Sequence, residues 1–212
     1  MARIGIFGGS FNPIHNGHIA LARQLLRAAA LDEVWLMVSP QNPLKPGSDL
    51  LPASVRYDLA VRALSDSKVS CGGRLHACDF EFSLPKPTYT WTTLQRLRER
   101  YDHHFVLVIG ADNWQLFDSW RNHDDIVRNF EIVVYPREGS EMDAGSLPST
   151  VHLADVPLFP VSSTEVRRRV RVGESIAGLV PEQVEEEIAC LYGGRPVAAA
   201  GETEQNSNQH TI

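Results

Sequence analysis

The sequence lacks the marks of several common protein classes. It has only three cysteines in 212 residues and none of them in C-x-x-C spacing, so neither a disulfide framework nor a zinc site is indicated. No apolar run approaches the roughly 20 residues of a membrane span, and the run near the N-terminus is too short for the centre of a signal peptide. We therefore expect an untargeted protein of the reducing cytoplasm with no membrane partner.

Positive charge is scarce as well. The formal net charge is −6 at pH 7, whereas proteins that hold long nucleic acids usually neutralise the phosphates with a clustered basic surface. Long nucleic acid is therefore excluded as a partner, but small anions remain open because they need only a few local cations. Hydrophobic residues at 43% and charged residues at 22% are ordinary for a folded domain.

Apolar runs rich in β-formers alternate with segments of helical spacing, which predicts an α/β fold with a parallel, doubly wound, Rossmann-like sheet. We expect a single domain over residues 1–193 and a disordered polar tail over 194–212, because the tail cannot bury enough apolar area to order itself. Residues 137–150 read as a surface loop. The predicted strands are Ile4–Phe7, Val34–Val38, Phe105–Ile109 and Ile132–Tyr135.

Helices are predicted where apolar residues recur three and four apart. We place Arg56 on the outer face of the second helix. A further strand is expected over His76–Phe82, with Ala77, Asp79 and Glu81 on one face. The first predicted helix begins near His18 and ends near Ala30. Further helices are predicted over Ser54–Leu64, Thr90–Arg100, Ser163–Val172 and Pro181–Leu191.

The stretch GGSFNPIHNGH at residues 8–18 follows the first strand. Gly8, Gly9 and Ser10 allow backbone N–H groups to approach an anion, and the helix that follows directs its partial positive end to the same place. A dinucleotide site needs G-x-G-x-x-G and an acidic residue after strand two, but that strand ends in Ser39 and Pro40. A G-x-x-x-x-G-K phosphate loop is absent too, because the chain has no Gly-Lys pair.

His15 and His18 lie three residues apart where the first helix should begin, so they share one helical face. Two imidazoles beside an anion-binding turn suit the stabilisation of charge on a transferring phosphoryl group. Taken alone, two histidines at this spacing at a helix start are more often a polar cap or a surface pair than a functional site. A zinc site is disfavoured because no third ligand lies nearby in the sequence.

Two later segments offer a second set of phosphate and nucleotide contacts. Ser162 and Glu165 have the spacing of a capping box, but the same helix start with Arg167 also suits a phosphate. Asp112 follows Gly110 at the end of the strongest predicted strand, where α/β proteins bind ligands. It is either an acceptor for ribose hydroxyls or a helix cap.

Residues 9–18 resemble the G-[ST]-F-x-P-x-H-x-G-H signature of the nucleotidylyltransferase superfamily, and GGSFNPIHNGH is especially similar to bacterial nicotinate-nucleotide adenylyltransferases. Val161–Arg167 resembles the second signature, [IV]-S-S-T-x-x-R. Tyr89–Leu94 resembles a Y-T-x-x-T-L segment, in which Trp91 departs from the usual aliphatic residue, and Trp120 lies eight residues after the G-x-D aspartate. The resemblance implies a sheet of the nucleotidylyltransferase type.

The resemblance also implies the reaction, in which the adenylyl group of ATP passes to nicotinate mononucleotide, giving deamido-NAD and pyrophosphate in NAD biosynthesis. Mg²⁺ would be bound through the ATP phosphates, and no residue is assigned as its direct ligand. His15, His18 and Arg167 are the implied catalytic residues. The implied ATP contacts are Gly8, Gly9, Ser10, Phe11, His15, His18, Gly110, Asp112, Ser162, Ser163, Thr164 and Arg167. The implied mononucleotide contacts are Ser10, Phe11, Asn42, Lys45, Thr90 and Trp120.

Two other functions remain open on the sequence alone. One is another adenylyl- or cytidylyltransferase of the superfamily, such as phosphopantetheine adenylyltransferase, although those commonly have Thr at the position of His15. The other is a nucleotide sensor without catalysis, which would tolerate the loss of His18 or Arg167. Individually, Lys45, Thr90 and Trp120 also fit a surface lysine, a helix cap and a core aromatic. The oligomeric state is not indicated.

Overall fold

A six-stranded, fully parallel sheet forms the centre of the molecule in a computed structural model that describes residues 1–40, 50–140, 142, 145 and 147–194. The strand order is β3-β2-β1-β4-β5-β6, so the chain winds outward in both directions from β1. This is a doubly wound Rossmann-like sheet, as the alternating sequence pattern predicts. The strands are β1 (Arg3–Gly9), β2 (Glu33–Val38), β3 (Leu75–Cys78), β4 (His104–Gly110), β5 (Glu131–Tyr135) and β6 (Val151–Leu153).

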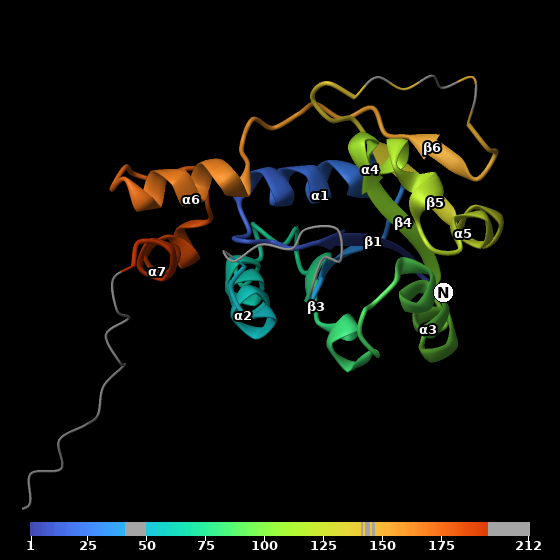
Figure 1. Ribbon diagram of the computed structural model, residues 1–212, viewed down its shortest axis with the longest axis horizontal. Helices are drawn as coiled ribbons and strands as arrows, with labels where there is room; N and C mark the ends of the chain where they lie inside the picture. Colours follow the sequence, from blue (N-terminus) through green and yellow to red (C-terminus); the bar gives the residue numbers. More distant parts are fainter. Residues whose placement is uncertain (41–49, 141, 143–144, 146, 195–212) are drawn as a thin grey trace, which may run out of the picture.

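Helices cover both faces of the sheet (Figure 1). One face packs against α1, α2, α6 and α7, and the other packs against α3, α4 and α5. The helices are α1 (Asn16–Ala28), α2 (Ala53–Ala63), α3 (Thr90–Arg100), α4 (Ala111–Gln115), α5 (His123–Asn129), α6 (Ser163–Arg171) and α7 (Glu182–Tyr192). Short 3₁₀ turns lie at η1 (Phe80–Ser83) and η2 (Phe117–Ser119).

The central strands are apolar at nearly every position because both faces of the sheet are buried. In β4, Val106 and Val108 belong to the core under α1 and α2, whereas Phe105, Leu107 and Ile109 belong to the core under α3 and α5. Side chains therefore alternate between the two cores with the period of two that strand geometry imposes. No helix among the described residues is both long enough and apolar enough to cross a membrane.

The structure departs from the predicted strand over His76–Phe82. The strand ends at Cys78 and a 3₁₀ turn begins at Phe80. The turn brings the Glu81 carboxylate into the interior, where it accepts hydrogen bonds from Thr93 Oγ1 at 2.8 Å and Ser39 Oγ at 3.2 Å. A buried carboxylate needs hydrogen-bond donors. The 3₁₀ turn places the Glu81 carboxylate beside these two hydroxyls, and the strand therefore ends before it.

Arg56 is also placed differently from the prediction. It was expected on the outer face of its helix, yet it is 0% exposed and its guanidinium lies beneath the loop that follows β1. Helical periodicity identifies the face of α2 correctly through Leu59 and Ala60, which are buried. Charge alone was the basis for placing Arg56 outward, and the carbonyl groups that accept its hydrogen bonds cannot be recognised from the sequence.

Smaller differences lie at element ends. The first helix begins at Asn16 rather than near His18, and β1 extends to Gly9, which pairs with Val38. The edge strand β6 was not predicted, because a three-residue strand after a polar loop gives little periodic signal. Part of the predicted loop over 137–150 and all of the predicted tail beyond Gly194 lie outside the described residues.

Candidate active site

Several of the predicted site residues lie at the carboxyl ends of β1 and β4. This is where the chain changes winding direction, and open α/β sheets bind ligands at such a switch point. Gly8 and Gly9 end β1, and Gly110 ends β4. A Cβ placed on Gly8 would meet no atom within 4 Å, so there is open space beside the end of the strand. The switch point therefore offers a place for a ligand at the predicted position.

The loop between β1 and α1 is held by an inward-facing aromatic ring. Phe11 is 2% exposed, and its ring lies edge-on to Phe7 at 5.7 Å and to His18 at 4.9 Å between centroids. Its φ angle of 44° lies in the left-handed region, which is uncommon for a bulky residue and needs surrounding contacts to persist. Because the ring is buried, Phe11 can contact a nucleotide only through its main chain.

The two histidines form a reciprocal cap at the start of α1. His15 Nδ1 accepts from the His18 backbone N–H at 3.3 Å, and His18 Nδ1 accepts from the His15 backbone N–H at 3.2 Å. The rings stack with centroids 3.6 Å apart. A Cβ on Gly17 would lie 3.0 Å from His15 Nδ1, so a side chain at this position would require the His15 ring to shift. The sequence offers two interpretations of these histidines, a polar helix cap or a pair that faces a phosphate. The structure allows both at once, because the cap uses Nδ1 of each ring and leaves Nε2 available.

The hydrogen-bond pattern fixes the protonation of the histidines. An Nδ1 that accepts a hydrogen bond cannot carry a proton, so both rings are neutral and each bears its proton on Nε2. Burial lowers the pKa of His15 to about 3, with a further contribution from the charge of Arg137. Burial also lowers the pKa of His18 well below its usual value, helped by His15 and Arg137. The pair therefore supplies neutral N–H donors, and positive charge comes from the arginines nearby.

The depressed pKa of His15 predicts acid-sensitive stability. Between pH 6.5 and about 3 the unfolded chain binds a proton at His15 that the folded chain does not, so the free energy of unfolding falls as pH falls through this range. Urea denaturation of the wild type and of His15→Asn between pH 7.5 and 5 measures the effect. Asparagine still caps the helix but does not titrate. The variant should therefore lose less stability, by about 1.4 kcal/mol per pH unit below pH 6. Equal slopes would contradict the neutral state of His15.

The start of α6 lies against the same loop. The Ser163 hydroxyl donates to Pro13 O at 2.9 Å, and Arg167 Nη1 donates to Asn12 O at 2.6 Å. Arg167 Nη2 also donates to Thr164 Oγ1 at 3.4 Å, while its Nε–H is buried with no partner in the described part of the chain. Sequence positions 150 residues apart are thereby joined at one site, as the two signatures imply.

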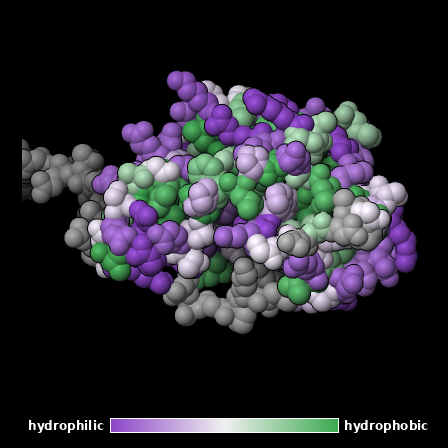
Figure 2. Space-filling model, turned by 90° about the horizontal axis from the view of Figure 1, so that it is seen from above, coloured by the Kyte–Doolittle hydropathy of each residue, from purple (hydrophilic) through white to green (hydrophobic). Residues whose placement is uncertain are grey.

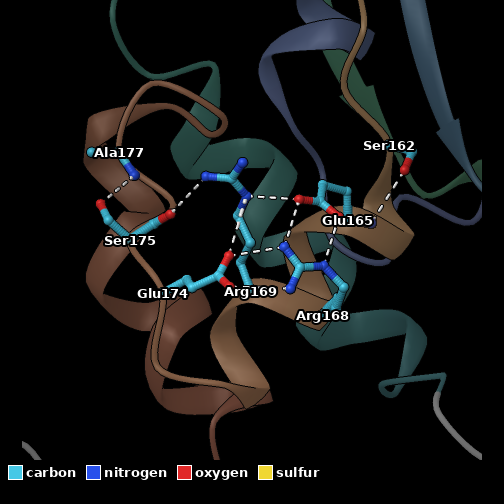
Figure 3. A network of polar contacts seen from close by, with 7 residues as sticks. All are labelled: Ser162, Glu165, Arg168, Arg169, Glu174, Ser175 and Ala177. Atoms are coloured by element: carbon cyan, nitrogen blue, oxygen red, sulfur yellow. Dashed lines mark hydrogen bonds and ion pairs between the residues drawn. The ribbon is translucent and has the colours of Figure 1, made fainter.

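The arginines that follow Arg167 take part in a separate network (Figure 3). Ser162 caps α6 by accepting from the Glu165 N–H at 3.2 Å. The Glu165 carboxylate pairs with Arg168 at 2.9 Å and with Arg169 at 2.7 Å. A capping box would instead require this carboxylate to accept from the Ser162 backbone N–H. Glu174 completes the network through Arg168 at 2.8 Å. The arginine run is therefore divided, with Arg167 directed to the loop and its neighbours paired on the surface.

Arg137 is a site residue that the sequence analysis did not identify. It follows β5 and was assigned to a surface loop, yet its guanidinium donates to the Tyr135 hydroxyl at 3.1 Å and lies 3.7 Å from Asp112 Oδ1. Its charge also contributes to the lowered pKa of both histidines. The signal that could have identified it is its place directly after a parallel strand, at the same edge of the sheet as Gly110.

A narrow cleft runs from His18 to this arginine. Most of the residues that line it have apolar side chains, and they include Leu158 and Phe159, which are 52% and 47% exposed. Figure 2 shows green apolar side chains among purple polar ones on the upper face of the molecule. The cleft is lined by Phe7, Gly17, His18, Leu21, Tyr135, Pro136, Arg137, Val156, Pro157, Leu158, Phe159 and Val161.

Two of the predicted mononucleotide residues, Thr90 and Trp120, lie on α3 and next to η2, while Ser10 and Phe11 lie in the loop after β1. Thr90 is the first residue of α3, and Tyr89 rather than Thr90 occupies the N-cap position. Trp120 is half-buried, with its ring 5.2 Å from that of Phe117. The Arg121 guanidinium lies 4.8 Å from the centre of the Tyr89 ring, so the two segments are neighbours. Asn42 and Lys45 lie outside the described residues.

Among the described residues, no group of three or more His, Cys, Asp or Glu side chains is placed to hold a metal ion. The polar groups around the two histidines are instead N–H donors and guanidinium groups, with Asp112 the nearby acid. This donor set is complementary to phosphate oxygens.

Fold and site together are those of a nucleotidyltransferase. A family model described as cytidylyltransferase-like matches residues 6–169, which is most of the chain, so the chain belongs to this family. Its curated relatives narrow the assignment. A probable nicotinate-nucleotide adenylyltransferase of Bacteroides fragilis is 46% identical over 82% of this chain and 85% of its own. A probable nicotinate-nucleotide adenylyltransferase of Cytophaga hutchinsonii is 41% identical over 87% of this chain and 94% of its own. Within the family, the chain is one of the nicotinate-nucleotide adenylyltransferases, enzymes of NAD biosynthesis.

Solved structures of low sequence identity share the fold. The Plasmodium falciparum nicotinic acid mononucleotide adenylyltransferase complexed with NaAD superposes with a TM-score of 0.76 at 20% identity, over 91% of this chain and 98% of that one. A putative nicotinate-nucleotide adenylyltransferase from Vibrio parahaemolyticus superposes with a TM-score of 0.65 at 23% identity, over 89% of this chain and 99% of that one. The predicted Rossmann-like fold of the nucleotidylyltransferase type is confirmed.

Proposed function

We propose that this enzyme transfers the adenylyl group of ATP to nicotinate mononucleotide, giving deamido-NAD and pyrophosphate. The observation that carries the proposal is the reciprocal cap of His15 and His18. It fixes two Nε2–H donors at the start of α1, beside the guanidinium of Arg137 and close to the loop that Arg167 holds. The naming of the curated relatives supports the choice of acceptor.

ATP binding is assigned to the main chain at the end of β1 and at the start of α6. The Ser163 hydroxyl already donates its proton to Pro13 O, so Ser163 would contact phosphate through its N–H group, whereas the Ser162 hydroxyl accepts from the Glu165 N–H and keeps its own proton to donate. Arg167 Nη2, which is exposed and lies 3.4 Å from Thr164 Oγ1, would donate to a phosphate oxygen. The proposed ATP residues are Gly8, Gly9, Ser10, Phe11, His15, His18, Gly110, Asp112, Ser162, Ser163, Thr164 and Arg167, to which we add Arg137.

The reaction is an in-line displacement at the α-phosphorus. An oxygen of the mononucleotide 5′-phosphate forms the new P–O bond, and the bond to the β-phosphate oxygen breaks with release of pyrophosphate. The attacking oxygen is already anionic at pH 7, so no general base is needed. Catalysis then consists of positioning and charge stabilisation. His18 donates to the α-phosphate, while His15 and Arg167 stabilise the leaving group.

Mg²⁺ fits this donor set as a companion of the ATP phosphates. Its preference for oxygen ligands and retained water suits phosphates that the protein holds with N–H groups, and it would add charge stabilisation on the leaving group. Neutral imidazoles that donate through Nε2 complement the phosphate oxygens left free by the metal.

The mononucleotide is assigned to the segments around Thr90 and Trp120. A flat, half-buried indole suits stacking against a pyridinium ring, which also gains from cation–π attraction. Ser10 and Phe11 would contribute main-chain contacts, and Asn42 and Lys45 complete the proposed set. Cys71, Cys78 and Cys190 are free thiols, which supports a reducing cytoplasmic location.

Pyrophosphate release with different acceptors tests the proposal. The protein is incubated with ATP, Mg²⁺ and, in parallel, nicotinate mononucleotide, nicotinamide mononucleotide or 4′-phosphopantetheine. We expect the highest kcat/KM with nicotinate mononucleotide. Preference for phosphopantetheine would assign the chain to the other branch of the superfamily, and no release with any acceptor would favour a sensor.

A further inference from the structure

Arg56 is the most deeply buried charged group of the described chain, and it makes a set of contacts that the reaction scheme does not use. Its hydrogen bonds in the described chain go to backbone carbonyls. Nε donates to Leu51 O at 2.8 Å, Nη2 donates to Ser39 O at 2.9 Å and to Pro40 O at 3.2 Å, and Nη1 donates to Ser10 O. One guanidinium therefore joins the residues that directly follow β1 and β2 to the segment that leads into α2.

Stability alone is a poor explanation for this arrangement. Removing a guanidinium from water carries a large desolvation penalty, and well-packed apolar side chains often replace buried ionic groups at no loss of stability. Burial accordingly lowers the pKa of Arg56. The contacts are nonetheless specific, because a planar fork with five donors is the side chain that can serve carbonyls in three directions.

The Ser10 carbonyl connects Arg56 to the site. Because the peptide unit is planar and trans, holding this oxygen toward Arg56 turns the Phe11 N–H to the opposite side of the loop. The Phe11 φ of 44° must be maintained by its surroundings. Two residues further along the loop, Arg167 Nη1 donates to Asn12 O at 2.6 Å and the Tyr192 hydroxyl donates to Asn12 Oδ1 at 2.5 Å. Arg56, Arg167 and Tyr192 thus hold the loop between them, and Arg56 is the one of the three that binds Ser10, the residue next to Gly9.

We propose that Arg56 is a positioning residue for adenylyl transfer, which acts through the Ser10 carbonyl to set the orientation of the loop between β1 and α1. The role rests on the proposed function, since this loop is where ATP would bind. Arg56 contacts no substrate. Its effect is to present the loop N–H groups and the His15 and His18 pair to the phosphates in one fixed arrangement.

Lysine at this position separates positioning from charge. Arg56→Lys keeps the positive charge and most of the volume, but an ammonium group cannot serve carbonyls on three sides. A misplacement of about 1 Å at an active site can cost 10²-fold in rate. We expect kcat per folded molecule to fall at least tenfold in Arg56→Lys, and the KM for ATP to rise.

Arg74 offers a matched control. It also donates to two backbone carbonyls, Asp32 O at 2.7 Å and Leu31 O at 2.6 Å, but at the amino ends of β2 and β3, away from the site. Arg74→Lys should lower the melting temperature somewhat and leave kcat and KM within twofold. Both variants replace an arginine that donates to backbone carbonyls, but only Arg56 does so beside the site. A loss of kcat in Arg56→Lys alone would therefore come from the location of the contact.

The experiment measures pyrophosphate release, folded fraction by circular dichroism and melting temperature for the wild type and both variants. Arg56→Gln, which keeps two donors, is measured beside Arg56→Lys so that the result does not depend on one variant folding well. A kcat per folded molecule within twofold of the wild type in either Arg56 variant would overturn the role. An inactive wild type would instead contradict the proposed function itself, because Arg56 would then not have been altered.

Discussion

Replacement of His18 by alanine should lower kcat for pyrophosphate release by about 10²-fold or more, which is the cost of removing one preorganised donor to developing charge. The donor is Nε2–H, because Nδ1 accepts from the His15 backbone N–H at 3.2 Å. Alanine, however, also removes this acceptor and leaves a backbone N–H at the start of α1 unpaired. Its effect therefore combines a lost catalytic group with a damaged helix cap.

Asparagine separates the two contributions. In His18→Asn the amide oxygen can take the place of Nδ1 and accept from His15, while nothing replaces Nε2–H. We expect a melting temperature close to that of the wild type and a loss of kcat as large as in His18→Ala. His152→Asn, an exposed histidine on β6, serves as the control and should be unchanged. Near-normal turnover of His18→Asn would remove His18 from the reaction.

The sheet could be predicted because its physics is periodic and local. Strands buried on both faces are nearly continuous apolar runs, and Phe105–Ile109 has this form. Helices α3 and α6 begin at their predicted first residues, Thr90 and Ser163; Ser162 caps α6 with its side chain, whereas Tyr89 precedes α3 without a side-chain cap. The edge strand β6 has neither property, because it is short and its residues His152 and Leu153 are exposed.

The site was predictable where motif residues contact one another across one turn. The spacing of His15 and His18 already indicates a shared helical face, although not the reciprocal cap or the neutral state that burial imposes. Arg137 and Arg56 were missed for a different reason. Their roles depend on carbonyl, hydroxyl and imidazole groups that folding brings from distant segments, and a single arginine has no periodic signal.

Arg167 is the second residue whose loss should be severe. Its Nη1 holds Asn12 O, while its exposed Nη2 makes only a long hydrogen bond of 3.4 Å to Thr164 Oγ1 in the described chain, so the guanidinium both fixes the loop and retains a donor for phosphate. Arg167→Met should lower kcat by about 10²-fold and raise the KM for ATP, since one charge-stabilising group is removed. Arg167→Lys keeps the charge without the planar fork, and we expect an intermediate loss of about tenfold.

Arg168→Gln is the natural control for this pair, because Arg168 lies one residue further along α6 and pairs with Glu165 and Glu174 on the surface (Figure 3). Exposed ion pairs of this kind contribute at most about 1 kcal/mol to stability, and they lie away from the loop. Its kcat and KM should therefore stay within twofold of the wild type, even if the melting temperature falls slightly. Steady-state kinetics with ATP as the varied substrate decide the matter. If Arg167→Met and Arg168→Gln lost activity equally, the general basic character of α6 would be responsible, and the specific contact of Arg167 with the loop would not.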